Sequence, residues 1–304
     1  MNLNYQEALE EILNLPLQTI RVCAYWDEIE HSENNFSFET LDRIIQRTTF
    51  ANKKIILAVG IKSPRWPEFH IPKWVTEKYK DSSHQQTEVH NLCHEYTKKV
   101  IERYKCYENI THLQIENEPL NSLDVTNGRS ISQQFLHDQL QLATLLKKPH
   151  QKILTTNAIN IFPYQIGQPF TDAFQFNIQN SDAFGVNVYT KIGIPYRLYI
   201  QPFPWFYWKL KNWQQQATDA NKESWITELQ AEPWEDGSAV HTTQPNFPSA
   251  SPQQTEKLTN KLISLGYHNI LFWGCEYWYW HKKQGREEWW NTITDLVTSR
   301  YRTF

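Results

Sequence analysis

The sequence predicts an α/β fold in which parallel strands form a (β/α)8 TIM-type barrel, as a single domain over residues 1–304. A length of 304 residues suits one large core, since such barrels run to about 250 residues or more. Short runs rich in Val, Ile, Leu and aromatic residues alternate with helical segments along the chain. That alternation is typical of a parallel sheet with helices packed outside it.

Seven segments have the composition of strands that are buried on both faces. Each is short and almost continuously apolar, whereas a strand with one wet face alternates apolar and polar residues. The predicted strands are residues 19–25, 54–60, 110–117, 152–158, 183–189, 224–229 and 269–275.

The chain begins with an amphipathic helix, predicted over residues 5–15, rather than with a strand. A complete barrel needs one more strand before that helix, so we expect the first strand to be absent from this chain. Further on, Ser37 is placed to cap a helix over residues 38–51. Ser251, followed by a proline, begins another helix that Gly266 ends.

Charge and motif content exclude several classes of protein. Lys and Arg number 30 against 33 Asp and Glu, and no basic stripe indicates a nucleic-acid partner. No apolar run approaches ~18 residues, and the acidic N-terminus is unlike a secretory signal. We therefore expect no membrane partner and a cytoplasmic location. The four cysteines lack metal spacing, no Gly-rich phosphate loop occurs, and His90 and His94 lack the glutamate of a zinc helix, so we expect neither metal nor cofactor.

Tryptophan is unusually abundant, with 13 in the chain. A buried indole N–H needs a hydrogen-bond partner, so core packing alone seldom uses so many. Sugar rings are apolar on their faces and polar at their edges, which suits a flat apolar ring with one donor. The composition favours a carbohydrate ligand, with a tryptophan-rich core as the alternative.

Two glutamates lie at the ends of apolar strands, where a buried charge is costly unless it serves a purpose. Glu118 follows the predicted strand 110–117, and Glu228 ends the strand 224–229. Two further strands separate them in the chain, so in a barrel their side chains converge over its mouth. Glycoside hydrolysis needs such a pair, because one carboxyl protonates the leaving oxygen while the other attacks the sugar or activates water. Two carboxylates that form salt bridges are the alternative.

These residues resemble motifs of the clan A glycoside hydrolases, the cellulase-like and β-galactosidase-like retaining (β/α)8 enzymes. The Asn-Glu-Pro triplet at 117–119 is similar to the motif that ends strand 4 in that family. The Ile-Thr-Glu triplet at 226–228 is similar to the one that ends strand 7. The resemblance implies that Glu118 is the general acid/base and that Glu228 is the nucleophile.

Four further residues are candidates for the substrate site. Asn117, in the matching triplet, is an amide beside the acid that can hydrogen-bond a sugar 2-hydroxyl. The resemblance implies that Arg21 orients the nucleophile and that Tyr189 donates a hydrogen bond to it. Trp273 is similar to the tryptophan beneath the reacting sugar. Each has a structural alternative: a strand-end cap for Asn117, a bridge inside the barrel for Arg21, and core packing for the two aromatic residues.

Weaker candidates lie near the predicted strand ends. Trp26, Trp66 and Trp278 are candidate platforms for stacking a sugar, with loop packing as the alternative. Glu276 is a candidate contact to a sugar hydroxyl, with a salt bridge equally favoured. We place Glu232 outside the site, because it lies beyond the strand end.

Three segments that follow strands are long enough to build a substrate site at the C-terminal face of the barrel: residues 61–85, 190–211 and 235–250. Within the second, the aromatic run 202–208 is interpreted as a lid over bound glycan, with packing under the rim as the alternative. Glu116 shares a strand face with Glu118, and one of the two is expected at the rim.

The sequence as a whole predicts a hydrolase that cleaves β-linked oligo- or polysaccharides by double displacement. That mechanism places the two carboxyl groups about 5–5.5 Å apart. A transglycosylase that uses the same pair and a carbohydrate-binding pseudoenzyme are the alternatives. The sugar, the linkage and exo or endo action stay open.

Overall fold

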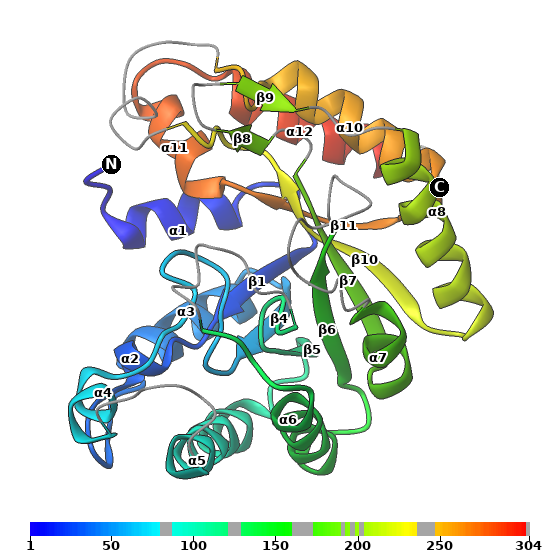
Figure 1. Ribbon diagram of the computed structural model, residues 1–304. Coiled ribbons are helices and arrows are strands. Elements are labelled where there is room, and N and C mark those ends of the chain that lie inside the picture. Colours follow the sequence, from blue (N-terminus) through cyan, green and yellow to red (C-terminus); the bar gives the residue numbers. More distant parts are fainter. Residues whose placement is uncertain are drawn as a thin grey trace.

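The computed structural model describes residues 1–79, 87–120, 129–159, 173–189, 192–194, 198–200, 204–235 and 247–301. In this part of the chain, seven parallel strands form one sheet that curls into a nearly closed barrel with helices around it (Figure 1). In spatial order they are β1 (Thr19–Cys23), β4 (Lys54–Val59), β5 (Ile110–Ile115), β6 (Lys152–Ala158), β7 (Ala183–Val188), β10 (Glu223–Gln230) and β11 (Asn269–Trp273). All seven predicted strands and the barrel class are confirmed.

The barrel is not closed by a ladder between its two end strands. β1 and β11 approach each other, but no pairing joins them within the described residues. The first described element is the helix α1 (Tyr5–Leu13), which directly precedes β1, as the sequence predicts. Side chains of β11 are all half-buried, whereas those of β7 are all buried. The end strands are more exposed because each lacks a neighbour on one flank.

Helices surround the sheet. After α1 they include α3 (Glu39–Phe50), α5 (Thr87–Tyr104), α6 (Gln133–Leu146), α7 (Ala173–Asn180), α8 (Pro204–Asp219), α10 (Pro252–Ser264) and α12 (Glu288–Tyr301). Further helices and hairpin strands lie in the connections: α2 (Trp26–Ile29), α4 (Lys73–Tyr79), α11 (Cys275–Lys283), β2 (Glu30–Ser32), β3 (Asn35–Phe36), β8 (Ile192–Ile194) and β9 (Leu198–Ile200). None of the helices in the described segments is long and apolar enough to cross a membrane.

One predicted helix cap is confirmed and another is wrong. Ser251 begins α10 as predicted, and its hydroxyl accepts a hydrogen bond from the backbone N–H of Gln254 at 3.3 Å. Ser37 does not cap α3, which begins at Glu39 after Phe38. The backbone N–H of Ser37 instead donates to the carbonyl of Ile29, so this residue still belongs to the hairpin before the helix.

The core has two layers, because parallel strands bury both of their faces. Inside the barrel, residues of separate strands pack against one another: Ile56, Leu154, Ala183 and Trp225. Outside it, two larger apolar clusters fill the space between strands and helices. Full burial of each large apolar side chain stabilises the fold by about 1.5–3 kcal/mol.

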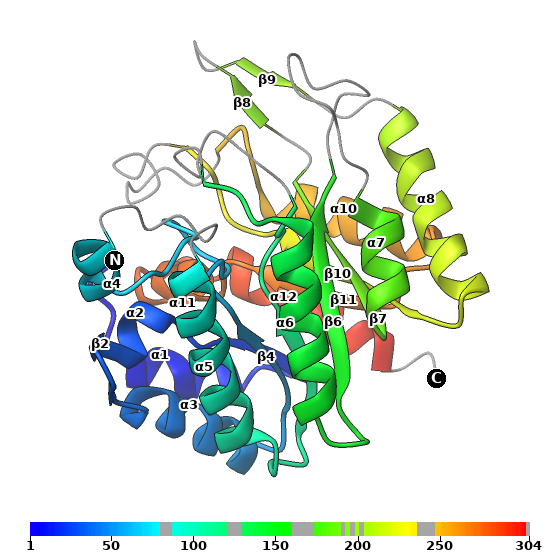
Figure 2. The ribbon, with the colours of Figure 1, turned by 60° about the horizontal axis from the view of Figure 1, so that its bottom comes forward.

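The aromatic run predicted as a lid belongs largely to a packed helix. Residues 204–208 form the first turns of α8, while 202–203 lie outside the described residues. Phe206 is fully buried and, with Leu210 and Trp213, packs against the outer face of the barrel. The lid prediction is therefore wrong for Phe206, which anchors the helix, whereas Trp208 of the same run is exposed. Figure 2 shows α8 beside α7, with the β8–β9 hairpin beyond the end of the barrel.

Candidate active site

Glu118 lies just beyond the C-terminal end of β5. Its side chain is buried, and one carboxyl oxygen accepts a hydrogen bond from the amide of Asn187 at 2.7 Å. Its backbone N–H donates to the hydroxyl of Thr156 at 2.8 Å. Burial raises the pKa of the Glu118 carboxyl to about 7, against the charge of Lys62, which lowers it. The residue is thus suited to hold a proton near neutral pH.

Glu228 lies within β10, where that strand bulges. The register of β10 shifts at this point relative to both β7 and β11, and such a bulge redirects side chains at an active site. One carboxyl oxygen accepts from the Arg21 guanidinium at 2.7 Å and the other from the Tyr189 hydroxyl at 2.5 Å. A cation and a hydroxyl donor together stabilise the ionised carboxylate. The contacts of Glu228 to Arg21 and Tyr189 are those that the sequence predicts.

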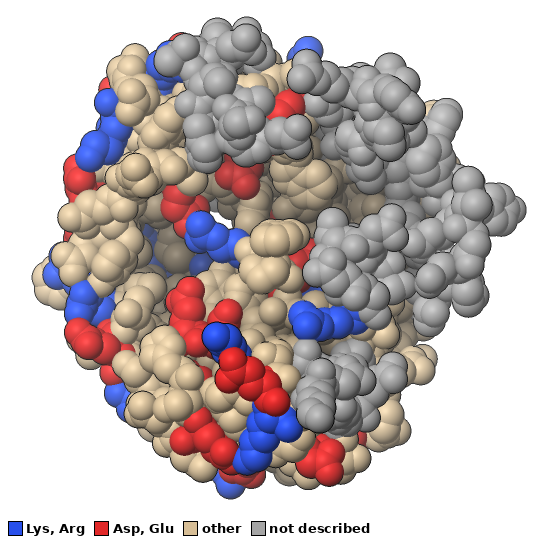
Figure 3. All heavy atoms as spheres, turned by 60° about the vertical axis from the view of Figure 1, so that its left-hand side comes forward, with Lys and Arg blue, Asp and Glu red and all other residues tan. Residues whose placement is uncertain are grey.

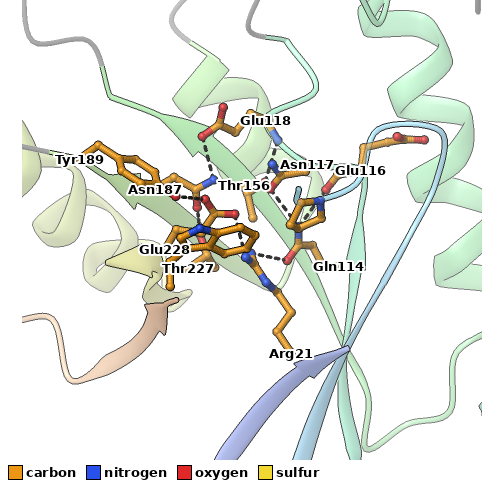
Figure 4. A network of polar contacts seen from close by, with 12 residues as sticks. Arg21, Gln114, Glu116, Asn117, Glu118, Thr156, Asn187, Tyr189, Thr227 and Glu228 are labelled. Atoms are coloured by element: carbon orange, nitrogen blue, oxygen red, sulfur yellow. Dashed lines mark hydrogen bonds and ion pairs between the residues drawn. The ribbon is translucent and has the colours of Figure 1, made fainter. Parts of the chain in front are cut away.

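Polar side chains from the strand interiors link the two glutamates (Figure 4). The Thr227 hydroxyl donates to the side-chain amide oxygen (Oδ1) of Asn187 at 2.7 Å, and the amide nitrogen of Asn187 donates to Glu118. On the other side, Gln114 lies 3.4 Å from the Arg21 guanidinium and 3.3 Å from the Asn117 amide oxygen. Both carboxyl groups are therefore held by a continuous set of hydrogen bonds.

Sequence reasoning missed several members of this set. Gln114, Thr156, Asn187 and Thr227 are polar side chains on strands of the barrel, and all four are buried. Because a buried polar side chain needs a partner, each was a detectable signal of an internal network. Asn117 was predicted, and it lies in the network with its amide oxygen accepting from Gln114 and Thr156.

Trp273 lies at the end of β11, next to Arg21. The guanidinium carbon of Arg21 is 5.6 Å from the centre of the indole ring, so the two stack as cation and aromatic face. The indole N–H donates to the Glu232 carboxyl at 2.8 Å. Trp273 thus lies beside the arginine that pairs with Glu228, and its role beneath the sugar stays a prediction.

Glu232 lies two residues beyond the end of β10, beside Trp273, and its placement outside the site stays a prediction. The backbone N–H of Ala231 donates to the carbonyl of Trp273, so the chain still runs along β11 at this point. Gly274, with φ of +121°, leaves room for Glu232, since a Cβ there would lie 2.7 Å from the Glu232 side chain. Burial, and then the charge of Glu276, raises the pKa of Glu232 to about 7.

Two of the three predicted tryptophan platforms belong to the core. Trp26 is fully buried and its indole donates to Glu30 at 2.8 Å. Trp278 is 1% exposed and its indole donates to the carbonyl of Ala231 at 2.7 Å. These two predictions are wrong, because both rings have apolar neighbours and a satisfied N–H that leave no face for a ligand.

Two other tryptophans do present exposed rings. Trp66 is 71% exposed, and its role as a platform stays a prediction. Trp234, which the sequence reasoning missed, is 51% exposed and lies tilted against Tyr189 with ring centres 4.3 Å apart. It thus presents a ring next to the residue that binds Glu228.

Glu276 has an ionic partner at the rim. Its carboxylate lies 3.9 Å from the Arg65 guanidinium, and both side chains are about half exposed. Figure 3 shows that the face of the molecule that carries α1, α2 and α11 is hollowed, with acidic and basic side chains along the hollow. The salt-bridge alternative for Glu276 is therefore observed, and its contact to sugar stays a prediction.

The helix that carries His90 and His94 is α5, and in the described residues it holds no metal-ligand set. No group of three or more His, Cys, Asp or Glu side chains there is arranged to hold a metal ion. His90 and His94 lie against the ring of Phe135, with ring centres 4.4 and 5.5 Å away. Both imidazoles contribute to packing between α5 and α6.

A seven-stranded parallel barrel with two buried glutamates at its C-terminal face defines a protein of the (β/α)8 glycoside hydrolase class. A family model described as Glyco_hydro_42, beta-galactosidase, matches residues 4–160. The chain belongs to this family.

The sequence match to known relatives extends over only part of this chain and part of each relative. Beta-galactosidase LacA of Lactobacillus acidophilus is 25% identical over 134 residues, which are 40% of this chain and 20% of that protein. The matched region thus spans about a fifth of the relative's length.

Solved structures share the fold at low sequence identity. A beta-galactosidase from Bacillus circulans sp. alkalophilus has a TM-score of 0.67 at 14% identity, over 98% of this chain and 54% of that one. A GH5_18 protein from Bifidobacterium longum, in complex with Manb1-4GlcNAc, has a TM-score of 0.69 at 13% identity, over 99% and 74%. These likenesses show the barrel fold.

Proposed function

We propose that this protein is a retaining β-glycosidase in which Glu228 is the nucleophile and Glu118 the general acid/base. The observation that carries the proposal is the unequal surroundings of the two glutamates. Glu228 is bound by the Arg21 cation and the Tyr189 hydroxyl, whereas Glu118 is bound by the neutral amide of Asn187. Two carboxyl groups in environments that favour opposite protonation states are what acid and nucleophile require.

The reaction proceeds in two displacements. In the first, a Glu228 oxygen attacks the anomeric carbon, the glycosidic bond breaks, and Glu118 gives its proton to the departing oxygen. In the second, Glu118, now ionised, takes a proton from water while that water attacks the anomeric carbon and releases Glu228. The sugar therefore leaves with its original configuration.

Asn117 is proposed to bind the sugar 2-hydroxyl. Its amide oxygen already accepts from Gln114 and Thr156, so its amide nitrogen is the end that remains for a ligand. Hydrogen bonds to the 2-hydroxyl strengthen as positive charge develops on the sugar, so this contact contributes most in the transition state.

Trp273 is proposed to lie beneath the reacting sugar, with Trp66 and Glu276 as further contacts at the rim. Family membership makes β-galactosides the first substrates to test, and the wider expectation is a β-linked oligo- or polysaccharide. We expect the reaction to need neither metal nor cofactor. A cytoplasmic location and a single domain over residues 1–304 also stay predictions.

A panel of aryl β-glycosides tests the proposal, read out by released phenol and by proton NMR of the sugar product. The expected result is turnover of at least one glycoside with the β-anomer formed first. A 2-deoxy-2-fluoro glycoside of the same sugar should then inactivate the protein and leave its mass on the peptide that contains Glu228. An α-anomer as the first product, or a label elsewhere, would contradict the mechanism.

A further inference from the structure

The segment that carries Glu118 has an unusual backbone. Glu116 and Glu118 both have left-handed conformations, with φ of +58° and +45°. Residues other than glycine rarely adopt such φ values, and they persist only where neighbouring contacts impose them. The direction of the Glu118 side chain therefore depends on whatever holds this backbone.

The carboxylate of Glu116 fastens the segment to the turn after β4. It accepts the backbone N–H of Ile61 at 3.0 Å and that of Lys62 at 2.6 Å. Gly60 allows this approach, since a Cβ there would lie 2.3 Å from the Glu116 carboxyl group. Figure 4 shows Glu116 directed away from Glu118 and Glu228, so Glu116 acts on the backbone rather than in the site.

Lys62 completes the attachment through both its backbone and its side chain. Its backbone carbonyl accepts from the N–H of Asn117 at 2.7 Å, and its Nζ donates to the backbone carbonyl of Glu118 at 2.9 Å. Lys62 is 1% exposed, and its Nζ also lies 3.2 Å from the carboxylate of Glu68. A buried ammonium group is thus hydrogen-bonded to the very residue whose conformation is left-handed.

Charges and dipoles reach the Glu118 carboxyl from four sides. The carboxyl groups of Glu228 on β10 and Glu68 after β4 raise the pKa of Glu118, Asn187 on β7 donates a hydrogen bond to it, and the Tyr189 hydroxyl lies beyond β7. Lys62 is the cation of this set and, after burial, the strongest influence on the pKa of Glu118, which it lowers. Its position thus affects both the geometry and the ionisation of Glu118.

We propose that Lys62 is a positioning residue for the acid/base, which holds the Glu118 backbone in its left-handed conformation and supplies the positive charge beside its carboxyl group. The inference rests on the proposed function of Glu118. Lys62 contacts Glu118 through the main chain, so it acts through that residue and not on the sugar.

Lys62→Met tests this, with Lys53→Met as the matched control. Lys53 lies at the other end of β4, and its Nζ likewise donates to a backbone carbonyl, that of Leu15 at 2.8 Å. Each variant is assayed with a glycoside of a poor leaving group, such as methylphenolate, and with one of dinitrophenolate, which departs without a proton. Lys62→Gln, which keeps a donor but not the charge, is the second variant.

For Lys62→Met we expect kcat/KM for the methylphenyl glycoside to fall by about 10- to 100-fold, since general acid help is worth about 10²–10⁴-fold in all. The rate at which the dinitrophenyl glycoside forms the glycosyl-enzyme should fall by less than about threefold, because that leaving group needs no proton. The basic limb of the pH profile of Lys62→Met should move to higher pH, because loss of a nearby cation raises the pKa of the acid. Lys53→Met should show neither effect.

Equal losses on both substrates with an unmoved pH profile would overturn the inference, since a merely structural lysine predicts that result. So would a failure of both Lys62 variants to fold where Lys53→Met folds. Failure of the proposed function is distinct, because the wild-type protein would then hydrolyse no glycoside. In that case carboxyl NMR of 13C-glutamate-labelled protein, assigned with Glu118→Gln, still tests whether Lys62→Met raises the pKa of Glu118, and an unmoved titration would overturn the inference.

Discussion

Arg21 and Glu228 form an ion pair in the interior of the barrel, with Nη2 and Oε1 2.7 Å apart and both side chains less than a tenth exposed. The pair joins β1 to β10, two strands that are far apart in the chain and are not neighbours in the sheet. Removal of one partner leaves the other buried and unpaired, which costs far more than loss of a surface pair.

Arg21→Met should therefore lower the free energy of unfolding by about 3–5 kcal/mol and nearly abolish turnover. Urea denaturation measures the first effect, and the glycoside assay measures the second. Arg47→Met is the control, since Arg47 pairs with Glu10 at the surface and its loss should change the free energy of unfolding little. Equal losses of unfolding free energy in Arg21→Met and Arg47→Met would show that the Arg21–Glu228 ion pair does not behave as a buried pair.

Azide rescue separates the roles of the two glutamates. Glu228→Ala removes the nucleophile, so turnover should nearly vanish on every substrate, and added azide should form an α-glycosyl azide by attack from the emptied face. Glu118→Ala keeps the nucleophile, so dinitrophenyl glycosides should still form the glycosyl-enzyme, and azide should yield the β-glycosyl azide. NMR of the product distinguishes the anomers. Reversed stereochemistry in the two variants would mean that the assignments are exchanged.

Glu232 should make the stability of the fold depend on pH. Burial raises the pKa of its carboxyl from 4.5 to about 7, so the folded protein binds this proton more tightly than the unfolded chain does. The resulting stabilisation is fully present below pH 4.5 and is lost as pH rises through about 7.

Glu232→Gln should remove that dependence. Each pKa unit corresponds to about 1.36 kcal/mol. The free energy of unfolding of the variant, relative to that of wild type, should therefore rise by up to about 3 kcal/mol between pH 4.5 and pH 8. Urea denaturation at both pH values measures the difference, and Glu39→Gln, an exposed residue, serves as the control. A constant difference between Glu232→Gln and wild type across this range would contradict the burial of an ionisable carboxyl at this position.

Trp234 should contribute to substrate binding rather than to folding. Its ring is half exposed and lies against Tyr189, so Trp234→Ala should raise KM by about tenfold while Tm changes little, since stacking on an aromatic ring is worth about 1 kcal/mol. Trp208→Ala is the control, because Trp208 is 63% exposed on α8. A rise in KM of the same size in the control would argue against a specific platform.

Much of the site could be predicted because its residues lie at strand ends. A parallel barrel brings the C-terminal ends of its strands together, so Glu118 and Glu228 could be placed near one another from their positions in the chain, whereas Arg21 and Tyr189 were placed by the family resemblance. Their observed contacts follow that expectation.

The solvent exposure of side chains that follow strand ends could not be predicted from their positions in the chain. Trp26 and Trp278 follow strand ends as Trp66 does, yet the first two are buried and the third is exposed. Which indole faces solvent depends on the helices and turns that pack over it, and those contacts come from residues distant in the chain. The same holds for Glu232, whose surroundings include Trp273, 41 residues further along the chain, and Gly274.

The sequence by itself determined the barrel class, the seven strands and the two glutamates, because hydrophobic periodicity and strand-end position are local properties of the chain. Only the tertiary structure decided how those glutamates are held. The Asn187–Glu118 hydrogen bond joins residues 69 positions apart, and the Lys62–Glu118 contact joins residues 56 apart. Such contacts depend on the bulge in β10 and on left-handed backbone at Glu118, and these conformations are stable only when the surrounding barrel imposes them.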